Sequence, residues 1–168
     1  MINITFPDGR VQEYASGVSA FQIAQSISEG LARNVLSAKV NGEVIDASRP
    51  ITQDSTLQLL TWNDLEGKAT YWHSSAHLMA EALESLYPDT KFGIGPAIEH
   101  GFYYDIDTNG VALSSHELGQ IEAKMIELAR QNNVYTRREV SKIEAIAYFT
   151  EKNDPYKLEL LQDLEDGK

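Results

Sequence analysis

Residues 1–14, MINITFPDGRVQEY, decide the fold of the first part of the chain. Ile2, Ile4 and Phe6 alternate with polar residues, which is the pattern of a strand with one buried face. Pro7-Asp8-Gly9 then supplies residue types that favour a turn, and Val11 to Tyr14 continues as a second extended segment. The stretch therefore predicts a β-hairpin.

An amphipathic helix is predicted directly after this hairpin. Ser19 and Gln22 have the spacing of a capping box, in which each side chain satisfies the other residue's backbone N–H. Gly30 is expected to end the helix, because glycine is a poor residue for a helix interior. Apolar residues recur at helical spacing between these points, at Ala20, Ile23, Ala24 and Ile27.

Three further strands complete the first unit. Ala38 to Val40 precede Asn41-Gly42, a strong signal for a two-residue hairpin turn, and Val44 and Ile45 follow it. The last strand is predicted at Leu57 to Leu60. The order β-β-α-β-β-β, with one helix to cover a mixed sheet, fits a β-grasp, ubiquitin-like domain over residues 1–62.

A second, α+β unit is predicted for residues 63–168, after the polar stretch 63–68. Thr70 is expected to cap a long helix that ends near Tyr87 and buries Trp72, Ala76, Met79, Ala80, Leu83 and Leu86. Two strands around a sharp loop are expected next, at 92–96 and 101–105, followed by a helix opened by Ser114 and Glu117 and a strand at 134–140. A further helix is opened by Ser141 and Glu144 and is expected to bury Ile143, Ile146 and Phe149. A short helical tail is expected at 156–164.

Composition limits the function classes. The chain has 25 acidic and 14 basic residues, and the net charge of -11 argues against a protein that holds nucleic acid by a broad basic surface. It has no cysteine, which excludes disulfides and thiolate metal sites within these residues. The first residues lack the pattern of a secretory signal, and no apolar run approaches the roughly 20 residues needed to cross a bilayer. We expect a cytoplasmic protein without membrane contact.

His73-Ser74-Ser75-Ala76-His77 is the sharpest chemical feature of the sequence. Two imidazoles at positions i and i+4 of a helix lie on the same face, so both can address one ligand, water or metal. A metalloprotease would need glutamate after the first histidine as general base, and Ser74 stands there instead. On spacing alone, a pair of structural or surface histidines stays an equal alternative.

The wider sequence resembles the N-terminal part of the threonyl-tRNA synthetase family. Residues 72–83, WHSSAHLMAEAL, resemble the histidine motif of the editing domain that threonyl- and alanyl-tRNA synthetases share. Residues 91–105 are similar to the glycine-tyrosine motif of the threonyl enzymes, and Tyr156-Lys157 resembles a lysine-bearing segment near the end of the same domain. The first unit looks like a TGS domain.

This resemblance implies hydrolysis of mischarged Ser-tRNA(Thr) by the second unit. It implies catalytic roles for His73, His77 and Lys157, and contact of Tyr104 and Gly95 with the aminoacyl-adenosine end of the tRNA. In the family, a further motif with aspartate, cysteine and histidine completes the pocket, so we expect a chain truncated before that motif. His100 departs from the family, in which an acidic or amide residue is expected before Gly101.

The resemblance also sets expectations for cofactors and partners. Two imidazoles without a thiolate are too few for a stable tetrahedral metal site, so no cofactor or metal is expected here. The parent enzyme would use ATP with Mg²⁺ and a Zn²⁺ in a domain that this chain lacks, would form a homodimer through that domain, and would bind the aminoacylated 3′ end of tRNA(Thr). Two alternatives stay open, namely a regulatory module of a GTPase or guanosine-tetraphosphate enzyme, and a free-standing editing protein.

Overall fold

A computed structural model describes residues 1–133, 136 and 138–164 of the 168-residue chain. The chain divides into two compact units, Met1–Trp72 and His73–Lys168. This division falls later than the boundary expected after residue 62.

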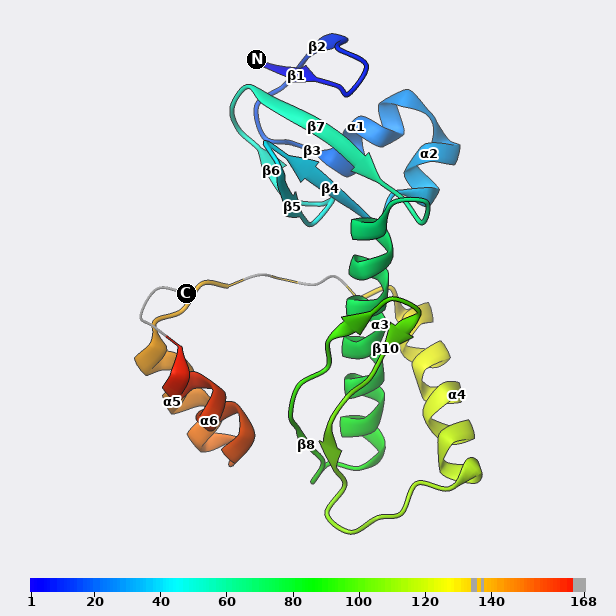
Figure 1. Cartoon of the computed structure of the whole chain (residues 1–168), viewed down its shortest axis with the longest axis vertical. Coiled ribbons are helices and arrows are strands. Elements are labelled where there is room, and N and C mark those ends of the chain that lie inside the picture. The colour runs from blue at the N-terminus through cyan, green and yellow to red at the C-terminus, as the bar shows by residue number, and fades with distance from the viewer. Residues whose placement is uncertain (134–135, 137, 165–168) are drawn as a thin grey trace. The chain divides into compact units, whose positions relative to one another are not determined.

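The first unit is a five-stranded mixed sheet with the strand order β2-β1-β7-β4-β5. Its strands are β1 (Ile2–Thr5), β2 (Val11–Tyr14), β4 (Ser37–Val40), β5 (Glu43–Ile45) and β7 (Ser55–Leu60). The pair β1–β7 is parallel and the other pairs are antiparallel. A separate short pair joins β3 (Val18–Ser19) to β6 (Pro50–Ile51). With a helix packed on the sheet, this is the predicted β-grasp arrangement (Figure 1).

Both predicted hairpins are confirmed. Thr5 is paired with Val11 across the first turn, where Gly9 has a φ of 82°. In the second turn Asn41 and Gly42 have φ of 50° and 86°, the left-handed pair that this dipeptide favours. Asn41 also ties the turn to β7, because its side-chain oxygen accepts from the Thr56 backbone N–H at 2.9 Å.

Two helices stand where one was predicted. The capping box is confirmed, since Ser19 Oγ accepts from Gln22 N at 3.2 Å and Gln22 Oε1 accepts from Ser19 N at 3.0 Å. Helix α1 (Ala20–Ile27) ends at Ser28, whose side chain caps the next helix, α2 (Glu29–Asn34). The prediction that Gly30 ends the helix is wrong, because Gly30 lies in α2 and the break comes from the extended backbone of Ser28.

The core of this unit lies between α1 and the sheet. Ile4 and Ile23 are completely buried, and each contributes about 1.5–3 kcal/mol by leaving water. The cluster consists of Ile2, Ile4, Phe6, Ala20, Ile23, Ala38, Ile51 and Leu57. Ile27, which was expected on the buried side of the helix, is 42% exposed.

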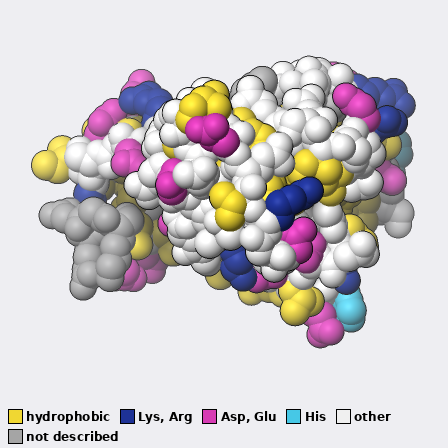
Figure 2. Space-filling model, turned by 90° about the horizontal axis from the view of Figure 1, so that it is seen from above, with side chains coloured by type: hydrophobic (Ala, Val, Ile, Leu, Met, Phe, Trp, Pro, Cys, Tyr) yellow, Lys and Arg dark blue, Asp and Glu magenta, His cyan; other side chains and the backbone are white. Residues whose placement is uncertain are grey.

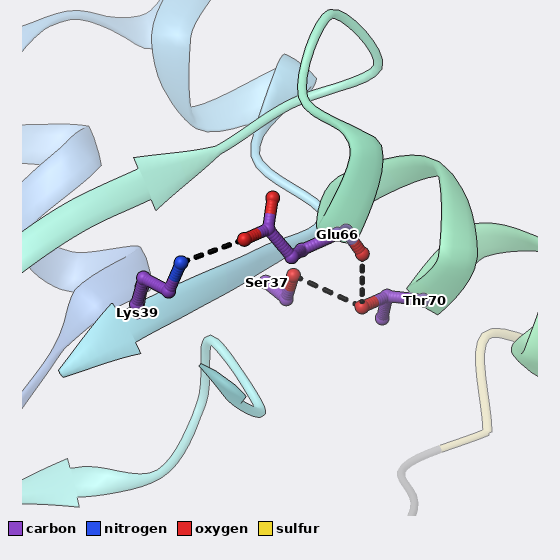
Figure 3. A network of polar contacts seen from close by, with 4 residues as sticks. All are labelled: Ser37, Lys39, Glu66 and Thr70. Carbon is purple, nitrogen blue, oxygen red and sulfur yellow. Dashed lines mark hydrogen bonds and ion pairs between the residues drawn. The ribbon is translucent and has the colours of Figure 1, made fainter. Parts of the chain in front are cut away.

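Helix α3 (Leu65–Leu86) begins earlier than predicted. Thr70 is therefore not its cap, and its hydroxyl instead donates to the Glu66 carbonyl at 2.9 Å inside the helix. The same hydroxyl lies 3.1 Å from Ser37 Oγ on β4, and Lys39 Nζ of that strand lies 2.6 Å from Glu66 Oε1 (Figure 3). The hydrogen bond from Lys39 holds the pKa of the Glu66 carboxyl below its usual value. The polar stretch expected to link the domains is thus partly helix, bound to the sheet.

The described part of the second unit contains four two-residue strands and a helical core. Each of the two predicted strands is divided into two shorter strands, and we call the two segments, 91–98 and 101–107, the arms. The arms pair at both ends, β8 (Lys91–Phe92) with β11 (Ile106–Asp107) and β9 (Ala97–Ile98) with β10 (Gly101–Phe102). Backbone bonds from Gly93 N to Asp105 O and from Asp105 N to Ile94 O join the arms between these pairs. Helix α4 (Ser115–Gln131) has the predicted Ser114–Glu117 capping box. The core consists of Ala82, Leu83, Ile121 and Leu128.

Several details of this unit differ from prediction. On α3, Ala76 and Leu83 are buried as expected, whereas Leu86 is 36% exposed. The helices α5 (Lys142–Glu151) and α6 (Pro155–Asp163) form, but α5 has no buried stripe, since Ile143 is 81% exposed. The strand predicted over 134–140 falls partly outside the described residues, and residues 136 and 138–140 are not in a strand. The prediction of an α+β chain is confirmed. Among the described helices, none is both long and apolar enough to cross a bilayer.

Gly67 provides a test of how closely α3 packs on the first unit. A Cβ at this position would lie 2.0 Å from the Thr61 carbonyl oxygen, so Gly67→Ala should destabilise the unit by about 1–3 kcal/mol through overpacking. Urea unfolding followed by tryptophan fluorescence measures this, because Trp62 and Trp72 both lie in the first unit.

Gly30→Ala is the matched control. It lies in α2, and a Cβ added there would have no atom within 4 Å, so the substitution should leave the unfolding midpoint unchanged or raise it. Equal midpoints for the two variants would contradict the close contact.

Candidate functional site

His73 and His77 contact each other on one face of α3. Their Nε2 atoms lie 3.0 Å apart, and the rings are nearly perpendicular, at 89°, with centroids 4.6 Å apart. The helix places them together because positions i and i+4 are neighbours on its surface. Both residues are exposed, so water and a ligand can reach them.

His77 is less basic than an ordinary histidine. Partial burial of its ring is the largest effect that lowers its pKa, and the positive charges of His73 and Lys157 lower the pKa further. All three effects penalise the imidazolium form. His77 is therefore a neutral imidazole at neutral pH, able to accept a proton.

Lys157 reaches this site from the first turn of α6. Asp154 caps the helix, because its Oδ1 accepts from Lys157 N at 3.1 Å, and Pro155 occupies the first helical position. The Lys157 Nζ donates to the Gly93 carbonyl at 2.8 Å, which ties α6 to the strand segment after β8. The ammonium is thereby held at a defined point while its charge acts on His77.

Tyr104 and Gly95 face each other across the two arms. A Cβ at Gly95 would lie only 2.5 Å from the Tyr104 ring, so the ring rests directly on the glycine backbone. Phe92 packs edge-to-face against the same ring with centroids 5.5 Å apart. Burial and the charge of Asp154 raise the pKa of the Tyr104 hydroxyl, which keeps it protonated.

The structure places the residues predicted for the site in two groups. His73, His77 and Lys157 form one electrostatically coupled group, and Tyr104 and Gly95 form a second group that Asp154 links to α6. Sequence reasoning missed the role of Asp154, although an aspartate directly before a proline is a recognisable helix-cap signal. It also missed the Gly93 carbonyl, because no side chain marks it. The roles of these residues in a reaction stay predictions.

A cavity of about 420 Å³ lies beside this group, between the arms and α6. Its lining combines apolar side chains with a carboxylate rim, namely Gly93, Ile94, Asp105, Ile106, Asp107, Tyr156, Glu159, Leu160 and Asp163. Neither His73 nor His77 lines it. The cavity therefore neighbours the histidine site without containing it.

The other two histidines lie apart from this group. The His100 side chain is 87% exposed, with its Nε2 3.6 Å from Glu99 Oε1, and His116 Nε2 lies 3.3 Å from the Gln120 amide. In the part of the chain that the structure describes, no three His, Cys, Asp or Glu side chains gather closely enough to hold a metal ion. The absence of a bound metal stays a prediction.

Gly95→Ala should disturb the packing of the Tyr104 ring against the backbone of residue 95. Because the added methyl would overlap the ring, we expect a loss of about 1–3 kcal/mol in unfolding free energy, measured by urea denaturation and circular dichroism. The cost should fall in a Tyr104→Ala background, where the ring is gone. Gly119→Ala, in an open part of α4, is the control and should not destabilise. A cost for Gly95→Ala that is independent of Tyr104 would refute the assigned contact.

Lys157→Met should raise the pKa of His77. The substitution removes one of the two positive charges that disfavour the imidazolium, while burial still holds the pKa below its usual value. The His77 C2 proton resonance, followed by NMR against pH, measures this. Lys124→Met removes a lysine that pairs with Glu127 and should leave the His77 titration unchanged. An unaltered His77 titration in Lys157→Met would show that the two groups are uncoupled.

Comparisons with known proteins identify both the first unit and the whole chain. The TGS domain family matches residues 2–61. The chain is 66% identical over 167 residues to the threonine–tRNA ligase of Cytophaga hutchinsonii, 55% to that of Parabacteroides distasonis and 53% to that of Phocaeicola vulgatus. Each match covers 99% of this chain and 26% of the relative, so the chain spans about a quarter of their length. It belongs to the threonyl-tRNA synthetase family and corresponds to the N-terminal region of these enzymes.

Proposed function

We propose that this region carries the hydrolytic proofreading of mischarged Ser-tRNA(Thr) in a threonine–tRNA ligase. The observation that carries the proposal is the pair of imidazole Nε2 atoms 3.0 Å apart, with His77 held neutral beside the fixed cation of Lys157. A neutral imidazole in water contact is suited to accept a proton near pH 7. The similarity to threonine–tRNA ligases supplies the substrate class.

Such an enzyme needs a second, hydrolytic site for a physical reason. Serine lacks one methyl group of threonine, and a pocket that fits the larger side chain gains only about 1–3 kcal/mol from that group. This difference is too small for accurate protein synthesis. Hydrolysis of the wrong ester after it has formed raises the accuracy without a better synthetic pocket.

The reaction is attack of water on the ester that joins serine to the terminal ribose of the tRNA. His73 activates or positions the water, and His77 shapes the same pocket. The Lys157 ammonium provides positive charge near the developing oxyanion or a second partner for proton transfer. Tyr104 is a protonated phenol whose ring packs on Gly95. Together these two residues contact the aminoacyl-adenosine end.

The remaining requirements lie in other parts of such a ligase. We propose that it attaches threonine to tRNA(Thr) with ATP and Mg²⁺, uses a Zn²⁺, and dimerises, all through regions beyond this one, in the cytoplasm. Contact between this region and tRNA would be local. On the face shown in Figure 2, Lys and Arg side chains are interspersed with acidic and apolar ones and form no broad basic surface, which suits a local contact.

His73→Ala in a full-length ligase that contains this region tests the proposal. We expect at least a hundredfold loss in hydrolysis of Ser-tRNA(Thr), in keeping with the usual contribution of about 10²–10⁴ from a general acid or base, and unchanged threonylation. Deacylation of Ser-tRNA(Thr) and aminoacylation with threonine are the two assays. His116→Ala is the matched control, because this histidine lies on α4 away from the pair and should affect neither activity. Full hydrolysis by the His73→Ala enzyme would sink the assignment.

A further inference from the structure

We infer that His73 and His77 form a proton-sharing pair, in which each ring fixes the tautomer of the other and the two rings therefore play different parts. The basis is the direct Nε2 to Nε2 contact at 3.0 Å, which is a hydrogen-bond distance between two atoms of the same kind. One of the two rings is then a positioning residue that acts through the other, and each ring has a defined tautomer.

The number of ring protons restricts how the two imidazoles can pair. A neutral imidazole carries one N–H and one bare nitrogen, on either Nδ1 or Nε2. Two Nε2–H groups facing each other would bring two hydrogens into collision, and two bare Nε2 atoms would oppose their lone pairs. Of the possible neutral combinations, only opposite tautomers form the bond, one ring donating through Nε2–H and the other accepting on bare Nε2.

This pairing decides what each ring presents on its far side. The donor ring has its proton on Nε2, so its Nδ1 is bare and is a base. The acceptor ring has its proton on Nδ1, which is therefore a hydrogen-bond donor. An isolated histidine exchanges between the two tautomers, whereas this pair presents one acceptor and one donor at the same time.

The pair can take up one proton and keep its contact, but not two. With one added proton, a doubly protonated ring donates to the bare Nε2 of its neighbour. A second proton leaves Nε2–H on both rings and breaks the bond. The groups that act electrostatically on His77 are His73 on α3 and Lys157 on α6, both of which are cationic or become so, and both oppose the second protonation.

The consequence for hydrolysis rests on the proposed function. Water gives a proton to the bare Nδ1 of the donor ring as its oxygen bonds to the ester carbonyl carbon. The donor ring passes its Nε2 proton to the Nε2 of the neighbour, which becomes an imidazolium. The donor ring ends neutral with its proton on Nδ1. When the bond between the carbonyl carbon and the ribose oxygen breaks, the imidazolium returns its Nε2 proton to the donor ring, the Nδ1 proton of that ring passes to the ribose oxygen, and both rings regain their starting tautomers. The charge thus moves one ring away from the reacting water.

The tautomers themselves can be measured in this chain without any assay of activity. Uniform ¹⁵N labelling and long-range ¹H–¹⁵N correlation spectra, recorded at alkaline pH, distinguish protonated from bare ring nitrogens. We expect one of His73 and His77 as the Nε2–H tautomer and the other as Nδ1–H, in either assignment. The tautomer mixture of free imidazole in water is the reference for an averaged ring.

Two variants complete the test. His77→Ala should return the His73 nitrogen resonances to the averaged positions of free imidazole, and His77→Gln, which keeps polar atoms at that position, guards against loss of folding as the cause. Two averaged rings in the unaltered chain, or a His73 spectrum unchanged by His77→Ala, would overturn the inference. Because these readings involve no tRNA, they are independent of whether the region hydrolyses Ser-tRNA(Thr).

Discussion

The turn spacing of helix α3 is the constraint on which most of the described arrangement depends. Its first turns carry Glu66 and Thr70, which contact β4, and Gly67, which lies against the Thr61 backbone. Its later turns carry Ala82 and Leu83, which belong to the core of the second unit. Between these two stretches the same 3.6-residue period superimposes His73 on His77. Packing and chemistry therefore come from one regular element.

Local chemistry predicted most of the first unit. The Asn41-Gly42 turn and the Ser19 capping box were found because the residues that form each device are adjacent or three apart, so their energies depend little on the rest of the fold. Gly30 and Thr70 were misread for the opposite reason. A glycine costs only about 1 kcal/mol in a helix, and the contacts of Ser37 and Lys39 with the first turns of α3 lie far away in the sequence.

The candidate site likewise has features that local sequence predicts and features that depend on residues far apart in the chain. The meeting of His73 and His77 follows from helical geometry and was predictable from their spacing. The bond from Lys157 Nζ to the Gly93 carbonyl joins residues 64 positions apart, so neither propensity nor periodicity contains it. Resemblance to a family supplied Lys157, Tyr104 and Gly95 as candidates, and the structure shows how Asp154 relates to them. The exposed α5 side chains show a further limit, because apolar periodicity alone does not say that a partner surface is present.

The attachment of α6 has a consequence for the dynamics of the site. This helix has no fully buried residue, so little apolar burial opposes its local opening, and the Lys157 bond to Gly93 is one of its few specific ties. When α6 detaches, the ammonium leaves His77, whose proton affinity then rises. The open form therefore binds more protons than the closed form, and linkage requires acidification to favour opening. Protonation of His77 and detachment of α6 are therefore thermodynamically linked.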